Sequence, residues 1–175
     1  RNSLSVKLLE PLQRYKIDYD KEGFCMDLVW EAGGPCHQLI TGDAGQTATS
    51  GFHIEQPGRM TGVVRRHGEE FKIDCHSMRD TSYGAREYES LASGGYFWGI
   101  AEGSSFHALC MGEKDVAYGR EANCIGGYIM KDGEMSSLVS GHRTVLEFGQ
   151  FGPSKVQFEG TDKLGRSMKA TGAID

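Results

Sequence analysis

Two stretches of the sequence place acidic and basic side chains at spacings that a β-strand would align. In the first stretch, His53 and Glu55 are two residues apart, so both side chains point to the same face of an extended strand. Such a pair can act as a base and its orienting carboxylate, or it can supply two metal ligands. Hydrogen bonds within a sheet could equally satisfy both side chains. The cupin spacing His-x-His is missing from this stretch, and we expect no metal and no cofactor.

The second stretch, residues 74–86, follows a strand-like segment and then breaks its alternation with Arg79, Asp80 and Arg86. A carboxyl group in an apolar lumen has a raised pKa and can donate a proton near neutral pH. A neighbouring arginine has the opposite effect, and an Asp80–arginine ion pair could simply lock a strand end. On a regular strand, one face would carry Asp74, His76, Met78, Asp80 and Ser82, and the other would carry Arg79, Thr81 and Tyr83.

A group of aromatic residues falls on two neighbouring predicted strands. Their rings could line an apolar pocket, where ring faces also stabilise a developing positive charge. Ordinary core packing is the alternative. The residues concerned are Tyr96, Phe97, Trp98, Phe106 and His107.

The elements that would position these residues are strands, because apolar and polar residues alternate with a period of two. The alternation is clear over residues 24–31, 71–76, 96–101 and 106–111. Turn sequences lie between such segments, with glycine supplying positive φ. Examples are Lys21-Glu22-Gly23, His67-Gly68 and Lys131-Asp132-Gly133.

The chain has 25 glycines and only 4 prolines, a composition typical of many tight turns and strand kinks. We therefore predict an all-β protein of roughly ten strands, either an antiparallel β-barrel or a closely curled sandwich; a closed barrel can hold one small apolar ligand. Residues 36–51 are poor in large apolar side chains, so we expect a long loop there, over one mouth of the barrel.

Composition excludes several classes of protein. The chain of 175 residues fits one domain spanning residues 1–175. Its net charge of −5 argues against a nucleic-acid binder. No apolar run is long enough for a membrane-spanning helix, so we expect no integral membrane segment. The 5 cysteines form no Cys-x-x-Cys pair, which indicates free thiols in a reducing compartment and a cytoplasmic protein.

Both chemical stretches resemble one known family. His53-Ile54-Glu55-Gln56-Pro57-Gly58-Arg59, followed after a hairpin by Arg79-Asp80-Thr81-Ser82-Tyr83-Gly84-Ala85-Arg86, is similar to the AttH-like proteins and carotenoid 1,2-hydratase (hydroxyneurosporene synthase). The usual family form is His-x-Glu-Gln-x-Gly-Arg, then Arg-Asp-His-Ser-Trp-Gly-x-Arg. Thr81 therefore replaces a histidine, and Tyr83 replaces a tryptophan. Met78 stands where the hydratases tend to have an aromatic residue.

The resemblance implies a lipocalin-like, calycin-type barrel and an apolar ligand such as a terpenoid, polyene or lipid. Family members often carry two barrels. This leaves open a companion barrel domain in a longer protein, and a homodimer is a further possibility. Asp80 matches the family aspartate that looks like the proton donor to an alkene in the hydratases.

Two main hypotheses about function follow. In the first, the protein is a hydratase, isomerase or cyclase in which Asp80 protonates the substrate. His53 and Glu55 would then orient water, and Tyr83 would form part of an aromatic wall. Residues expected to contact the substrate are His76, Met78, Arg79, Arg86, Tyr96, Trp98, Phe106 and His107. In the second hypothesis, the protein carries a hydrophobic ligand without catalysis, and Asp80 and Arg86 form a structural clasp. A filled barrel with a purely structural role is a third possibility.

Overall fold

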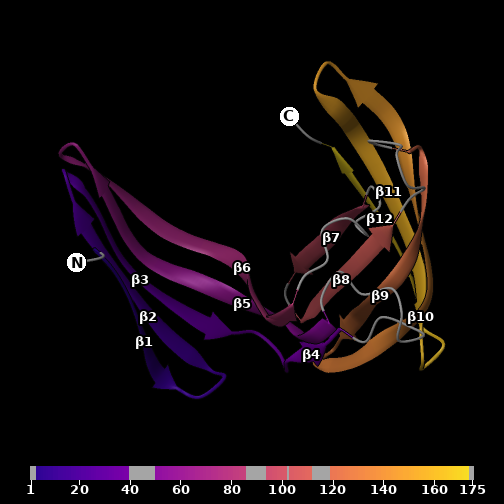
Figure 1. Ribbon diagram of the computed structural model, residues 1–175, viewed down its shortest axis with the longest axis horizontal. Helices are drawn as coiled ribbons and strands as arrows, with labels where there is room; N and C mark the ends of the chain where they lie inside the picture. The colour runs from indigo at the N-terminus through magenta and orange to yellow at the C-terminus, as the bar shows by residue number, and fades with distance from the viewer. Residues whose placement is uncertain (1–2, 40–49, 86–93, 102, 112–118, 174–175) are drawn as a thin grey trace. The chain divides into compact units, whose positions relative to one another are not determined.

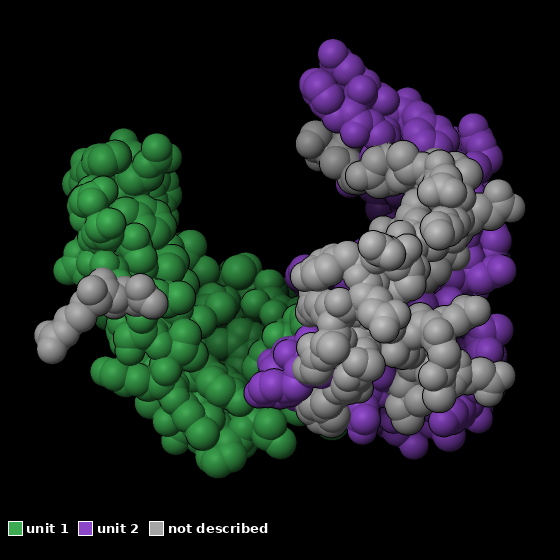
Figure 2. Space-filling view, in the orientation of Figure 1, with its two compact units in different colours: residues 1–36, 55–80 green, residues 37–54, 81–175 purple. Residues whose placement is uncertain are grey.

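The computed structural model describes residues 3–39, 50–85, 94–101, 103–111 and 119–173 (Figure 1). Within these ranges the chain forms strands and no helices, and every strand pair with a defined register is antiparallel. Contacts divide the chain into two compact units (Figure 2). Unit 1 comprises Arg1–Cys36 and Glu55–Asp80, and unit 2 comprises His37–Ile54 and Thr81–Asp175.

Unit 1 is an antiparallel sheet in which the strands follow the order β1-β2-β3-β5, with β6 paired to β5. Trp30 is a large buried side chain of this unit, 3% exposed, and Tyr15 packs edge-on against it at 5.7 Å between ring centroids. The strands are β1 (Leu4–Glu10), β2 (Arg14–Lys21) and β3 (Phe24–Ala32), together with the unit 1 parts of β5 (Ser50–Arg66) and β6 (Glu69–Ala85).

Unit 2 contains a six-stranded sheet in which each strand pairs with the next along the chain, from β7 to β12. This sheet curls, and its described edge strands are β7 and β12 (Figure 1). The strands are β7 (Gly94–Ala101), β8 (Ser104–Met111), β9 (Glu121–Lys131), β10 (Glu134–Gly149), β11 (Gly152–Asp162) and β12 (Ser167–Ala173). The unit also holds β4 (His37–Gln38), the start of β5 and the end of β6.

The pleat of β8 separates two different environments. Phe106, Ala108 and Cys110 point to one face, where Phe106 stacks on Phe158 at 5.7 Å and an apolar core forms. His107 lies between Phe106 and Ala108, so its side chain points to the opposite face. The curled sheet thus has an apolar face and a face that carries polar rings.

The turns form where the sequence predicts them. Glu22, His67 and Asp132 each have a positive φ and each precede a glycine that also has a positive φ, which suits the right-handed twist of a two-residue hairpin. The register between β8 and β9 shifts between Leu109 and Cys110, which makes a bulge beside Gly126.

One local prediction is wrong at its start. The segment predicted to be a loop, residues 36–51, opens with the short strand β4, and the amide of Leu39 donates to the carbonyl of His53 at 2.9 Å. The scarcity of large apolar residues does not exclude a strand here, because a strand of two residues needs only one buried side chain. In β4 that side chain is His37. Residues 40–49 lie outside the described residues.

The all-β antiparallel class is confirmed, and the described residues form twelve strands in two sheets where roughly ten strands were expected. No helix within the described residues is both long and apolar enough to cross a membrane. All five cysteines are free, as their spacing indicated.

Gly127 is a position where only glycine fits. Its φ is +144°, and a Cβ atom there would lie 2.0 Å from the backbone carbonyl oxygen of His107. We expect Gly127→Ala to lower the free energy of unfolding by about 2 kcal/mol or more, because backbone must move to admit the methyl group. Urea denaturation measures this change.

The matched control is Gly172→Ala. Gly172 lies on the edge strand β12, and a Cβ atom there meets no atom within 4 Å. The free energy of unfolding of this variant should change by less than about 1 kcal/mol, because alanine reduces the conformational freedom of the unfolded chain only slightly. Equal losses in the two variants would contradict the close-approach argument.

Candidate functional site

Strand β5 is buried without interruption from His53 to Gly58. Neighbouring side chains on a strand point to opposite faces, so His53 and Glu55 share one face and Gln56 takes the other. Both Glu55 and Gln56 are 1% exposed. A buried carboxyl group and a buried amide both need polar partners, so neighbouring residues must supply hydrogen-bonding groups to this segment of β5.

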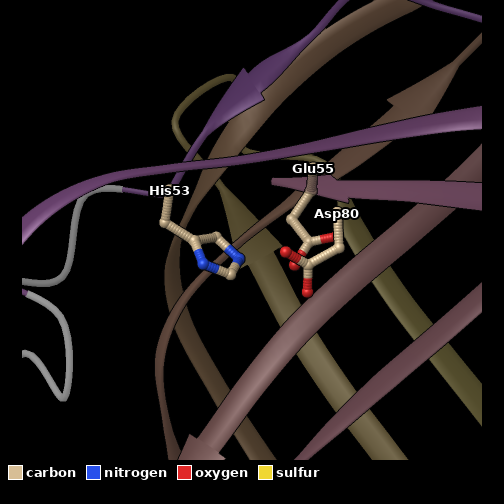
Figure 3. Close-up of side chains that lie close together, drawn as sticks. All are labelled: His53, Glu55 and Asp80. Atoms are coloured by element: carbon tan, nitrogen blue, oxygen red, sulfur yellow. The ribbon is translucent and has the colours of Figure 1, made fainter. Parts of the chain in front are cut away.

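His53, Glu55 and Asp80 form a compact group on the paired strands β5 and β6 (Figure 3). One ligand-type atom from each side chain lies within 4.8 Å of the corresponding atoms of the other two. His53 and Glu55 are buried, whereas Asp80 is exposed. The predicted pairing of His53 with Glu55 on one face is therefore present, and β6 adds the predicted acid to it.

Carboxyl and imidazole groups are the side chains that most often accept and donate protons in catalysis, and three of them lie together here. Asp80, as the exposed member, can meet a substrate. The donor set of one nitrogen and carboxylate oxygens is also one that several divalent metals accept.

A serine and a tyrosine hold the ring of His53 from within unit 2. The hydroxyl oxygen of Ser82 lies 2.7 Å from Nδ1 of His53. The ring of Tyr96 stacks on that of His53, with centroids 6.1 Å apart and planes 5° from parallel. The hydrogen bond and the stacked ring fix the direction of the imidazole, which a proton-transferring group requires.

Tyr96 and His53 begin a longer series of rings in unit 2, which we call the ring row: His53, Tyr96, His107, Tyr128 and His37. The ring centroids lie 5.2 Å apart for Tyr96 and His107, and 6.2 Å apart for His107 and Tyr128. Those of Tyr128 and His37 lie 5.2 Å apart. Imidazole and phenol rings therefore alternate. At its far end, Nε2 of His37 lies 3.2 Å from the hydroxyl of Ser137.

Two histidines of the ring row are neutral at pH 7. Burial lowers the pKa of His107 to about 3, and the nearby His53 and His37 contribute in the same direction. Burial also lowers the pKa of His37 to about 4, assisted by the charge of Lys163. The ring row therefore presents polar but uncharged rings next to His53.

The opposite face of β5 carries a structural cluster in unit 1. Gln56 donates from Nε2 to the carbonyls of Leu12 and Gly34 at 2.9 and 3.0 Å. Arg79 donates from Nε to Oε1 of Gln56 at 3.2 Å, and its guanidinium lies 5.3 Å from the centroid of the Tyr15 ring. Arg79 and Asp80 point to opposite faces of β6, so Arg79 belongs to this cluster.

The structure brings some predicted site residues together and places others elsewhere. His53, Glu55 and Asp80 form one group, and Tyr96 and His107 join His53 through the ring row. Phe106 packs in the apolar core. The remaining predicted residues are spread out: Tyr83, Trp98 and His76 are exposed, Met78 is half-buried, and Arg86 lies outside the described residues.

Sequence reasoning missed His37 and Tyr128. Tyr128 pairs with His107 across β8 and β9, and His37 packs against Tyr128. No local spacing signals these contacts, because the residues are far apart in sequence. The register of β8 on β9 would have indicated Tyr128, since opposite residues share a face.

The neutral histidines predict a pH-dependent stability. The ordinary histidine pKa is 6.5, against about 3 for His107 and about 4 for His37 in the folded protein. Between pH 6.5 and 4 the unfolded chain therefore binds more protons, so stability falls as the pH falls through this window. Each such histidine contributes up to about 1.4 kcal/mol per pH unit. Urea denaturation at pH 7.5, 6.5 and 5.2 measures the change.

His107→Gln is the matched variant, because it removes one titrating group. The dependence of the unfolding midpoint on pH between 6.5 and 5.2 should become clearly shallower. The lowered pKa values of Asp74, Glu121 and Asp162 start from ordinary values of 3.8, 4.5 and 3.8, so their contribution is lost mainly at lower pH. A midpoint in the parent protein that is constant over this range would refute the prediction.

Comparison with known proteins gives one match. A search of curated proteins and a search of solved structures each found no significant match. The family model that matches, DUF7064, is described as a domain of unknown function and covers residues 1–174. Because that match spans nearly the whole chain, the protein belongs to the DUF7064 family.

Proposed function

We propose that the protein is an enzyme that transfers a proton to a carbon–carbon double bond of an apolar terpenoid, polyene or lipid. The observation that carries this proposal is the group formed by buried Glu55, exposed Asp80 and buried His53. An alkene is a weak base, so its protonation needs a carboxylic acid held in its protonated form. In the group, Asp80 is the exposed carboxyl group that a substrate can reach, and Glu55 is a second carboxyl group beside it.

Each group has a role in the proposed step. The O–H bond of Asp80 breaks as its proton forms a C–H bond with one alkene carbon, which leaves a cation on the other carbon. In hydration, a water oxygen adds to that cation, and the proton it loses passes to His53 or Glu55. In isomerisation or cyclisation, the cation instead loses a C–H proton to the same base. The original acid is restored by proton exchange within the group.

The ring row supports a cationic intermediate. Aromatic faces attract a positive charge, and Tyr96 stacks directly on His53. His107 is neutral because burial lowers its pKa to about 3, so it does not repel a cation near Tyr96. A charged imidazole in the same place would oppose this chemistry.

The fold supports a finer assignment that also forms part of the proposal. The curled antiparallel sheet of unit 2, in which successive strands are neighbours, is the arrangement expected of an opened lipocalin-like barrel. A distant relationship to the AttH-like and carotenoid hydratase proteins would account for that sheet and for the position of Asp80 beside His53. Five free thiols support a cytoplasmic location.

The test is deuterium incorporation. The protein in D₂O is incubated with lycopene, geraniol or oleic acid in detergent micelles, and the recovered compound is analysed by mass spectrometry. Protonation of an alkene leaves a carbon–deuterium bond whether the product is hydrated, isomerised or cyclised. We expect Asp80→Asn and Glu55→Gln to lower the rate of incorporation by about 10²- to 10⁴-fold.

Asp74→Asn is the matched control. Asp74 lies on the same strand as Asp80, is exposed and forms an ion pair with Arg59 at 2.5 Å, away from the proposed site. Its rate of deuterium incorporation should stay within about twofold of the parent protein, as is usual for a surface substitution. An unchanged rate in Asp80→Asn would reject the proposed role of Asp80.

A carrier of hydrophobic molecules is the second candidate, and the apolar face of the curled sheet favours it. Native mass spectrometry of the purified protein would then show a bound hydrophobic molecule. After incubation of the complex in D₂O, the recovered molecule would contain no carbon-bound deuterium, because a carrier transfers no proton to it. Asp80→Asn would lower the melting temperature and leave the amount bound unchanged.

A further inference from the structure

A second candidate binding site lies at one end of the curled sheet in unit 2. It is a pocket with a volume of about 530 Å³, lined in part by the last residues of β7 and the first residues of β12. This volume falls in the range of small-molecule sites, roughly 300–1,000 Å³. We propose that this pocket binds an amphipathic monocarboxylate of the fatty-acid type, with its chain against the apolar core and its carboxylate beside Lys131.

The wall of the pocket continues the apolar core. Phe106 and Met168 line it, and both also pack on the buried cluster of the curled sheet. Ile129, which is 5% exposed and lies opposite Phe106 in the β8–β9 register, completes the apolar part of the wall. A hydrocarbon chain placed here would extend an existing core and would gain about 25 cal/mol for each Å² of apolar surface that it buries.

The position of the pocket favours a small molecule over an added strand. It includes Gly99–Ala101 at the end of β7 and only Ser167 and Met168 at the start of β12. A strand that closed the sheet would have to pair along the full length of one edge strand, whereas this hollow is confined to one end. A hydrocarbon chain needs no backbone partners and fits such a short opening.

Two cationic side chains line the same pocket. The guanidinium of Arg166 is already engaged: Nε donates to Oδ2 of Asp162 at 2.7 Å, and Glu134 lies 3.7 Å from it. Its charge is thereby balanced. Lys131 forms no ion pair within the described residues, although Asp132 follows it in the turn and Glu134 is opposite it in the β9–β10 register. Lys131 is therefore the cation available to a bound carboxylate.

This site goes beyond the proposed acid–base function. The floor residue Phe106 points to the face opposite that of its neighbour His107, and the ring row lies on the His107 face. Binding here requires no contribution from His53, Glu55 or Asp80. The measurement below therefore stands or fails whatever the result of the deuterium experiment.

The test is isothermal titration calorimetry of the whole chain with sodium laurate below its critical micelle concentration. Saturable binding with one site is expected. Ala101→Trp should abolish it, because Ala101 lines the pocket and the indole would fill it. The matched control is Ala173→Trp at the end of β12. It is also an exposed alanine on an edge strand, and it should bind laurate like the parent protein.

The head-group assignment has its own variant, Lys131→Met. It should weaken laurate binding by about fivefold, the size of a partly exposed charge pair, and leave binding of the uncharged 1-decanol unchanged. Equal weakening of both ligands, or no weakening of laurate, would overturn the role of Lys131. Absence of laurate binding to the parent protein, or equal loss in Ala101→Trp and Ala173→Trp, would overturn the pocket itself.

Discussion

The constraint on which most of the structure depends is the alternation of β8, where Phe106 and Ala108 enter an apolar core and His107 points the other way. One strand therefore supports two environments that differ sharply in polarity. The apolar face stabilises the curled sheet through burial, since Ala108 and Phe158 are 0% and 1% exposed. The polar face can then bury histidine and tyrosine rings, because they face each other rather than the hydrocarbon core. The neutrality of His107 is a consequence of that arrangement.

Strand β5 also buries polar side chains on both faces, but their partners differ from one face to the other. Gln56 is fully buried, and two backbone carbonyls and Arg79 satisfy its amide, so its burial costs little. Glu55, one residue earlier, is equally buried but lies with Asp80 and His53. A strand that needed only stability would gain more from apolar side chains at these positions. Placing a buried acid next to a second acid and an imidazole is an arrangement typical of sites that move protons.

Much of this could be predicted from the sequence where the causes are local. The alternation over residues 24–31 predicted β3, and Lys21-Glu22-Gly23 predicted the turn before it, because strand pleat and positive φ are properties of neighbouring residues. The His53–Glu55 pairing followed from the same pleat. The contacts of Gln56 with Leu12 and Gly34, and the ring row from His53 to His37, could not be predicted. They depend on which strands pair and in what register, and one sequence does not contain that information.

The side chains that surround His53 bear on the proposed mechanism. In the sequence-based view, the acid would act inside an oily lumen, where desolvation alone would keep it protonated. Phe158 and its apolar neighbours form the core on the Phe106 face of the curled sheet, whereas His53 lies with the polar ring row. In the proposed reaction, the proton donor Asp80 therefore has the polar side chains of Glu55 and His53 beside it. A cation formed there would be stabilised by the faces of neutral rings, which gives the buried histidines a chemical reason to remain uncharged.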